Sequence, residues 1–331
     1  MKAIVITSIF NPTEAVKRFV EKTEYQVYVV GDKKTPQDWS CPNVRFISVA
    51  EQEGSRNRIA GLIPYNHYCR KMFGYLKAME EGATLIIDMD DDNIPYDHWG
   101  FPSLKGTFDA VGSANYVNIY QLYTDQKIWP RGFPLRFVNN DNKWMESISI
   151  GEEEINIGIW QGLADEDPDV DAIYRLTNGR PCFFNRRAPI VLNKKTVCPF
   201  NTQNTLIREE LFPLMYLPAF VTFRYTDILR GLVAQPIMWA HGYQLGFTDA
   251  TVIQKRNEHD FYKDFLSEIP MYETAEKVVE IVSATVSPVV SIYDNLYNSY
   301  LQLFNAGIVE KQELINLEAW IEDSKNCRRN G

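Results

Sequence analysis

The chain has 331 residues, a formal net charge of −9 and 45% hydrophobic residues. The length exceeds that of one ordinary domain, and the hydrophobic fraction is sufficient for a large core. Nucleic-acid binding usually requires a basic face, so the negative charge disfavours that function, and an anionic ligand would have to be held locally by a few cations or a metal ion. We therefore expect a globular protein that does not bind nucleic acid.

The cysteines and the apolar runs bear on the cellular compartment. The five cysteines form neither a CxxC pair nor a zinc-ligand pattern, and their number is odd. Such cysteines are typical of free thiols in a reducing compartment. The apolar run near the first residue is too short for a signal peptide, and no run of about 18 apolar residues predicts a transmembrane segment. We expect a soluble, cytoplasmic protein.

The first third of the chain shows strands alternating with helices. Short apolar or β-branched runs bounded by turn residues predict buried strands at residues 2–7, 25–30 and 44–49. Helices are predicted at residues 14–19 and across 68–79, where apolar residues recur on one stripe. This alternation predicts an α/β fold with a largely parallel, doubly wound sheet, whose strand ends open on one edge that binds a nucleotide.

Residues 84–93, TLIIDMDDDN, carry the strongest functional pattern. An apolar run typical of a buried strand contains Asp88 and leads directly into Asp90, Asp91 and Asp92. Carboxylates this close repel one another unless a cation compensates, and their oxygens suit Mg²⁺ or Mn²⁺. We expect Asp90, Asp91 and Asp92 to hold a metal ion that carries a diphosphate, and Asp88 to face a ribose or to orient the acidic group. The alternative is a solvated acidic turn.

Further polar residues are expected at the same edge of the sheet. Thr7 and Ser8 follow the first strand and Asp32 follows the second, the positions at which a base and a ribose are commonly received. Arg70 and Lys71 lie in the first turn of the second helix, where two cations are unfavourable without an anion nearby, so we expect both to contact a diphosphate. Ordinary turn chemistry and a solvated cationic pair are the alternatives.

Acidic residues in the second half of the chain are candidates for a general base. Asp227 lies at the predicted start of a helix, whereas Asp165, Glu166 and Asp167 lie in residues 161–177, an expected loop at the sheet edge. A base would take the proton from an attacking hydroxyl, and we rank Asp227 first. The alternatives are a solvated loop for the acidic stretch and, for Asp227, a helix cap or an ion-pair partner of neighbouring arginines.

A family resemblance rests on six collinear blocks between residues 31 and 260. The blocks are GDKKTP (31–36), IPYNHYCRKMFGYLKAMEEGATLIIDMDDDNIP (63–95), WPRGFPL (129–135), PFNTQNTL (199–206), FRYTDILRG (223–231) and VIQKRNEHD (252–260). Together they resemble the catalytic domain of the STELLO-like glycosyltransferases. The resemblance implies a GT-A fold, a divalent metal ion (Mn²⁺ or Mg²⁺), a UDP-sugar donor, and a carbohydrate or glycoconjugate acceptor.

A weaker resemblance reaches the reversibly glycosylated polypeptides, which are UDP-arabinopyranose mutases. In RGFPLR (131–136), Arg136 stands in a setting similar to that of the arginine that becomes glycosylated in that family. The stretch GIWQGLADEDPDVDA (158–172) is similar to the segment that follows it. This resemblance implies a self-glycosylating mutase in which Arg136 carries the sugar.

The last part of the chain changes character. His259, within RNEHD, is expected to contact the metal or the diphosphate, with a structural histidine as the alternative. Beyond it the pattern is helical and contains no chemical cluster. We therefore predict a catalytic domain at residues 1–260 and a C-terminal helical region at 261–331. Three roles are open for this region: a packed appendage, a contact in a homo-oligomer, or a support that positions the acceptor.

Three functions are consistent with these features. The first is a metal-dependent glycosyltransferase, in which Asp90 and Asp92 hold the metal and Asp227 is the base. The second is the self-glycosylating mutase, and the third is a non-catalytic module that binds a nucleotide sugar. We favour the transferase because the blocks of the first resemblance are collinear and span residues 31–260.

Overall fold

The structure is a computed structural model that describes residues 1–112, 116–138, 148–255 and 260–329. The strands are β1 Lys2–Thr7, β2 Tyr25–Val30, β3 Val44–Ile47, β4 Leu85–Asp90, β5 Asn93–Pro95, β6 Lys105–Val111, β7 Ile148–Glu166, β8 Ile190–Leu192, β9 Thr205–Arg208 and β10 Gln244–Gln254. The helices are α1 Glu14–Val20, α2 Val49–Gly54, α3 Lys71–Glu80, α4 Ala172–Thr177, α5 Thr226–Ala240, α6 Phe261–Thr285, α7 Ile292–Asn305 and α8 Lys311–Arg329. The predicted α/β class is confirmed.

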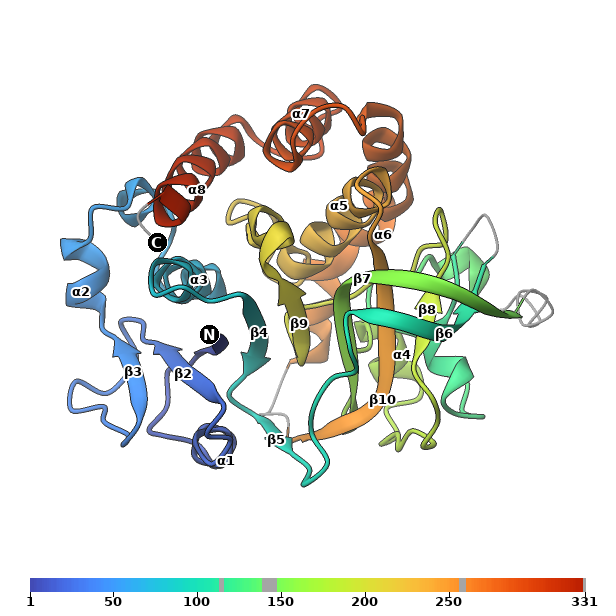
Figure 1. Cartoon of the computed structure of the whole chain (residues 1–331), viewed down its shortest axis with the longest axis horizontal. Coiled ribbons are helices and arrows are strands. Elements are labelled where there is room, and N and C mark those ends of the chain that lie inside the picture. Colours follow the sequence, from blue (N-terminus) through green and yellow to red (C-terminus); the bar gives the residue numbers. More distant parts are fainter. Residues whose placement is uncertain (113–115, 139–147, 256–259, 330–331) are drawn as a thin grey trace.

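The strands shown in Figure 1 form one sheet. Their order is β3-β2-β1-β4-β9-β7-β6-β8-β10-β5. Strands β3, β2, β1 and β4 pair in parallel, and Thr7 lies opposite both Val30 and Asp90. The carboxyl ends of three predicted strands therefore lie side by side, as expected. Strand β9 pairs antiparallel with both β4 and β7, so the sheet is mixed beyond this parallel part.

Helices cover both faces of the parallel part. Ala3 and Val5 of β1 belong to a buried cluster that includes residues of α3, whereas Ile4 and Ile6 pack with residues of α1. This alternation follows from the period of two in a strand, which sends successive side chains to opposite faces. Helix α3 is thereby held against the sheet just beside the acidic end of β4.

The acidic segment connects strands β4 and β5, which are also linked to each other through the pairing of other strands in the sheet. Strand β4 is linked through β9 and β7 to β10, which pairs with β5, and only Asp91 and Asp92 separate β4 from β5. The two carboxylates therefore lie in the short connection between β4 and β5. Both ends of the segment are fixed by sheet pairing, which distinguishes it from a free solvated turn.

The C-terminal helices pack on the helices that flank the sheet. Helix α6 contacts α4 and α5, α7 contacts α5, and α8 contacts α3, as Figure 1 shows for α8 above α3. The helical region expected after residue 260 is confirmed, while the domain boundary stays a prediction. Among the described residues, no helix is both long and apolar enough to cross a membrane.

Two predicted element boundaries were wrong. The strand expected at 44–49 ends at Ile47, because Ser48 accepts a hydrogen bond from Glu51 N and caps α2. The expected loop at 161–177 begins as strand: residues 161–166 are the end of β7, paired with β10. Polar and small residues hid this strand, since the segment is buried within the sheet where alternation is not required.

Gly74 of α3 allows the helix to lie close to the sheet. A methyl group at this position would overlap Val5 and lie 2.8 Å from Val30 Cγ2. We predict that Gly74→Ala lowers the free energy of unfolding by about 1–3 kcal/mol, because overpacking outweighs the better helix propensity of alanine. Urea unfolding would measure the change. Gly54→Ala in α2, where no atom lies within 4 Å of the added methyl group, is the control and should be near neutral or stabilising.

Candidate functional site

A cavity of about 260 Å³ opens at the carboxyl edge of β1, β2 and β4. The predicted ligand residues that line it come from four separate segments and are Thr7, Ser8, Asp32, Arg70 and Asp91. Its wall is completed mainly by aromatic and aliphatic residues, among them Ile9, Phe10, Tyr68 and Phe223. The structure therefore brings five of the predicted site residues to one concave surface at the expected edge of the sheet.

One wall of the cavity carries hydrogen-bond donors that lack an acceptor. Arg70, only 1% exposed, donates from Nε to Gln52 Oε1 at 2.6 Å, but its Nη2 atom is buried without a partner among the described residues. His67 accepts from Cys69 N at Nδ1, so its buried and unpartnered Nε2 carries the hydrogen. Burial lowers the pKa of His67 to about 4, so the ring is neutral at physiological pH. Unsatisfied buried donors of this kind suit a ligand that supplies oxygen or nitrogen acceptors.

Asp32 is fixed in the same wall. Its carboxylate accepts hydrogen bonds from Lys33 N at 2.7 Å and from His67 N at 3.1 Å. Asp32 therefore ties the end of β2 to the segment that precedes α3. The predicted position of this carboxylate at the edge of the site agrees with the geometry.

Beneath the cavity lies a buried group of charges around Asp88. The fully buried Asp88 carboxylate lies 2.8 Å from Lys71 Nζ and accepts from Tyr75 Oη at 2.6 Å and from Arg230 Nη1 at 2.8 Å. Lys71 Nζ also lies 3.1 Å from Asp90 Oδ1. Burial opposes the charge on Lys71, but Asp88 and Asp90 outweigh it and raise the lysine pKa. Asp88 and Lys71 thus face the protein interior and orient the acidic segment from below.

The acidic segment itself is held by polar neighbours. Asp91 Oδ2 accepts from Ser8 Oγ at 2.5 Å, and Asp92 accepts from Asn93 Nδ2 at 2.8 Å and Gln254 Nε2 at 3.3 Å. Burial raises the pKa of both Asp90 and Asp91 to about 6, and neighbouring carboxylates add to the shift. The positive charge near Asp90 and Asp91 is therefore not enough to offset the cost of ionising both carboxylates.

The predicted metal ligands do not already form a metal-binding cluster in the structure. Among the described residues, no group of three or more carboxylate, histidine or cysteine side chains is arranged to hold a metal ion. The donor set nevertheless fits Mg²⁺ or Mn²⁺, because hard oxygen ligands with raised pKa values gain most from a divalent cation. His259, the fourth predicted ligand, lies outside the described residues.

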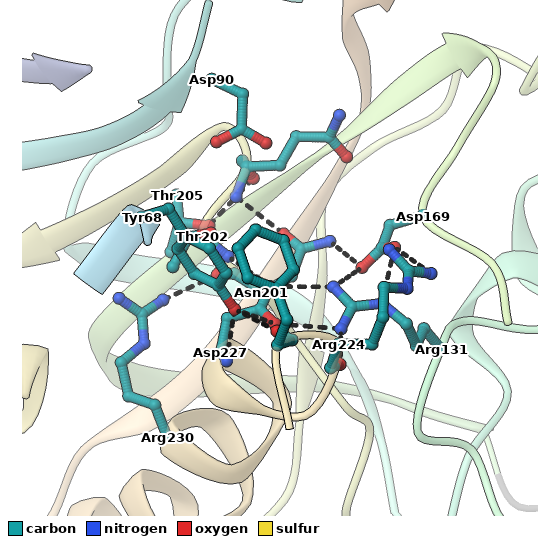
Figure 2. A network of polar contacts seen from close by, with 12 residues as sticks. Tyr68, Asp90, Arg131, Asp169, Asn201, Thr202, Thr205, Arg224, Asp227 and Arg230 are labelled. Carbon is teal, nitrogen blue, oxygen red and sulfur yellow. Dashed lines mark hydrogen bonds and ion pairs between the residues drawn. The ribbon is translucent and has the colours of Figure 1, made fainter. Parts of the chain in front are cut away.

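A second polar network surrounds Arg131 (Figure 2). Arg131 is 5% exposed and forms paired contacts with two carboxylates, at 2.9 Å to both oxygens of Asp169 and at 3.0 and 2.9 Å to the oxygens of Asp227. Asp227 Oδ1 also accepts from Tyr68 Oη at 3.1 Å, which links the network to the cavity wall. Asp227 lies in the first turn of α5, whereas the N-cap residue of that helix is Tyr225. Asp227 is therefore an ion-pair partner of Arg131 and not the helix cap.

The other predicted bases lie at the end of β7. Asp165 accepts from Phe184 N at 2.8 Å and Tyr96 Oη at 3.0 Å, and burial raises its pKa. Glu166 lies 3.0 Å from Lys255 Nζ with its side chain 33% exposed, and Asp167 pairs with Arg175.

Strand β10 separates the end of β7 from the acidic segment. Gln254 pairs with Asn93 of β5 on one side and with Glu166 on the other. Two strand spacings, about 10 Å, thus lie between Asn93 and Glu166.

Arg136 and Arg131 differ sharply although both lie in RGFPLR. The Arg136 side chain is 68% exposed, pairs with Glu276 of α6 and does not line the cavity. Arg131 was not assigned a role from the sequence, and neither were His67 or Tyr68. The signal for Arg131 was an arginine within an apolar, proline-rich segment, where a charge requires buried partners.

Comparison with known proteins finds similarity to the STELLO glycosyltransferases. The family model of the STELLO glycosyltransferases matches residues 224–329, which run from the start of α5 to the end of α8. Two Arabidopsis thaliana proteins, the probable glycosyltransferases STELLO1 and STELLO2, are each 27% identical to the chain. These matches cover 97% of this chain but 44% of each relative, so the chain spans less than half the length of the curated relatives it matches. The resemblance predicted from the sequence blocks is confirmed.

The raised pKa of Asp91 predicts a pH-dependent effect on stability. A carboxyl whose folded pKa is about 6 destabilises the fold once it ionises, so this destabilisation is complete above pH 6 and disappears as the pH falls towards 4. We predict that Asp91→Asn, which can still accept from Ser8, is more stable than the unaltered protein at pH 7.5 and loses most of this advantage at pH 4.5. Urea unfolding at the two pH values measures the difference. The exposed Asp125→Asn is the control, and an equal gain at both pH values for Asp91→Asn would contradict the assignment.

Proposed function

Because the chain is STELLO-like along almost its whole length, we propose that it is a GT-A glycosyltransferase that uses a divalent metal ion to move a sugar from a UDP-sugar to a carbohydrate or glycoconjugate acceptor. The observation that carries the proposal is the meeting of the cavity with the acidic segment: Asp91 lines the cavity and its neighbours in sequence are Asp90 and Asp92. A nucleotide in the cavity would have its diphosphate next to these carboxylates.

The cavity has the features that a nucleoside needs. His67 Nε2 and Arg70 Nη2 are donors without acceptors in the described part of the chain, and a base presents carbonyl acceptors. Asp32 supplies a fixed carboxylate that can accept from a base or ribose. Arg70 was expected to contact the diphosphate, but its bond to Gln52 of α2 and its place in the wall beside Asp32 support a contact with the nucleoside instead.

Charge balance supports the requirement for a metal ion. Lys71 is surrounded by Asp88 and Asp90 and has no exposed surface, so it cannot neutralise a diphosphate directly. Lys71 does not line the cavity, and among the described lining residues the lysine is Lys34, which is exposed. Asp90, Asp91 and Asp92 would hold Mn²⁺ or Mg²⁺. The bound ion would supply positive charge to the diphosphate as it departs with the nucleoside.

We choose the general base by asking which carboxylate an acceptor hydroxyl could reach. Both oxygens of Asp227 contact Arg131, and both oxygens of Asp165 accept hydrogen bonds from the protein. Glu166 has a partly exposed side chain and a single flexible lysine as partner. We therefore place Glu166 ahead of Asp227, Asp165 and Asp167 as the group that takes the proton from an acceptor hydroxyl, with Asp227 as a support for Tyr68 in the cavity wall.

A panel of radiolabelled UDP- and GDP-sugars, supplied with Mn²⁺, tests the function. We expect slow hydrolysis of a UDP-sugar that stops when EDTA is added, without labelling of the protein. Ring isomers together with label on Arg136 would support the mutase instead. If no donor reacts and none binds, the proposal is wrong.

The acidic segment should be required for turnover. We predict that Asp90→Asn and Asp92→Asn each lower the rate of donor hydrolysis by about 100-fold or more, because each removes a ligand and a charge from the metal site. The rate is measured at saturating Mn²⁺. Asp97→Asn, which alters a fully exposed carboxylate a few residues further on, is the matched control and should retain full activity.

His67 should contribute to nucleotide affinity. We predict that His67→Phe, which keeps the aromatic contacts with Tyr68 and Phe223 but removes the Nε2 donor together with the Nδ1 acceptor of Cys69 N, raises the Kd for UDP about tenfold. Isothermal titration with UDP and Mn²⁺ measures this. His98→Phe, at an exposed histidine, is the control. An unchanged Kd for His67→Phe would remove this residue from the nucleotide site.

A further inference from the structure

The loop of residues 219–223 forms part of the cavity mouth. It precedes α5, and Phe223 at its end is 50% exposed and lines the cavity. The Phe223 ring lies with its centroid 5.0 Å from that of His67 and 4.8 Å from that of Tyr68. The position of this loop therefore decides the shape of the wall that carries the unsatisfied His67 donor.

The loop is held from one side by a buried carboxylate of α8. Glu313 has no exposed surface and accepts from Ala219 N at 3.1 Å and Phe220 N at 2.8 Å, and it also accepts from Tyr216 Oη. These three donors all belong to residues 216–220. Among the described residues no lysine or arginine forms an ion pair with Glu313, so the loop donors themselves compensate the carboxylate.

Helix α6 holds the other end of the loop. Thr222 Oγ1 donates to Ser267 O at 2.5 Å, and Arg224 N donates to Ser267 Oγ at 3.3 Å. Arg224 Nε further donates to the fully buried Glu268 at 2.9 Å. The loop is thus held between two helices of the C-terminal region, while the side chain of Phe223 remains exposed at the cavity.

Helix α8 is itself fixed to the layer that supports the acidic segment. Trp320 has no exposed surface, and its Nε1 atom donates to Pro213 O at 2.9 Å. Its ring packs edge-on against Tyr75 of α3, whose hydroxyl donates to Asp88. One helix therefore contacts both the support of the acidic segment and the loop at the cavity mouth.

We propose that Glu313 is a positioning residue that sets the 219–223 loop, and with it Phe223, at the mouth of the nucleotide cavity. The C-terminal helical region is then a working part of the donor site and not an appendage. This inference rests on the proposed function for its kinetic consequence, but the hold on the loop can be measured without any substrate.

The chain offers a matched control on the same helix. Asp323 of α8 is also buried, at 4% exposed, and likewise accepts from two backbone amides, Arg58 N at 2.9 Å and Ile59 N at 3.0 Å. Residues 58 and 59 do not line the nucleotide cavity. Replacing Asp323 therefore disturbs the same kind of contact without touching the 219–223 loop.

The test compares Glu313→Gln with Asp323→Asn in the whole chain, by hydrogen exchange and by titration with UDP and Mn²⁺. The glutamine amide group would face one loop N–H with a donor instead of an acceptor, so we expect faster exchange across residues 216–225 and a Kd for UDP raised about tenfold. For Asp323→Asn we expect faster exchange confined to residues near 58 and 59, with an unchanged Kd.

Two results would overturn the inference. One is unchanged exchange across 216–225 in Glu313→Gln, and the other is an equal change in Kd for both variants, which would indicate a general loss of stability. If Glu313→Gln does not fold, Glu313→Asp, which keeps the charge but shortens the side chain, carries the same comparison. If the unaltered protein does not bind UDP, the proposed function fails, and the exchange of residues 216–225 alone still decides whether Glu313 holds the loop.

Discussion

The buried carboxylate of Asp88 connects the parts on which the site depends. It joins strand β4 to α3 through Lys71 and Tyr75, and to α5 through Arg230. A buried charge is stable only when it is paired and hydrogen-bonded, and removal of one partner from such a group typically costs about 3–5 kcal/mol. The residues that follow Asp88 are therefore presented from a rigid base. Lys71 also contacts Asp90 and so restrains the position of the acidic segment.

The acidic segment that follows Asp88 has less compensating positive charge than Asp88 itself. Asp88 has two cations, whereas Asp90 and Asp91 have raised pKa values because burial and neighbouring carboxylates disfavour their charged forms. When Asp90 and Asp91 are ionised, negative charge is therefore in excess on one side of the cavity. The other wall carries the His67 and Arg70 donors, which lack acceptors among the described residues. A divalent cation together with an anionic nucleotide would relieve both conditions at once, since each supplies what one wall lacks.

The sequence was sufficient for the parts of the fold with a simple period. The strands that end at Thr7, Val30 and Asp90 were predictable because buried strands are short apolar runs, and their parallel order placed Thr7, Ser8, Asp32 and Asp91 at one edge. The end of β7 was missed because polar and small residues interrupt its apolar run although the segment is buried. Asp227 was identified as important, but its partner Arg131 lies almost a hundred residues away, and no local pattern reveals such a pairing.

The same limit applies to the C-terminal helices. Their helical period was clear, but the buried carboxylates Glu268 and Glu313 looked like ordinary charged positions in helices. Only the packing shows that their oxygens face loops that lie about 45 and 95 residues earlier in the chain. Long-range satisfaction of backbone donors depends on tertiary structure, so residue type and spacing do not predict it.

The most direct measurement is the position of manganese and nucleotide in crystals grown with UDP and Mn²⁺. An anomalous difference map collected at the manganese edge should show a single strong peak within ligand distance of Asp90 and Asp92, with the nucleoside in the cavity between Asp32 and His67. A manganese peak elsewhere, or an empty cavity at saturating UDP, would contradict the assignment of this edge as a metal-dependent donor site.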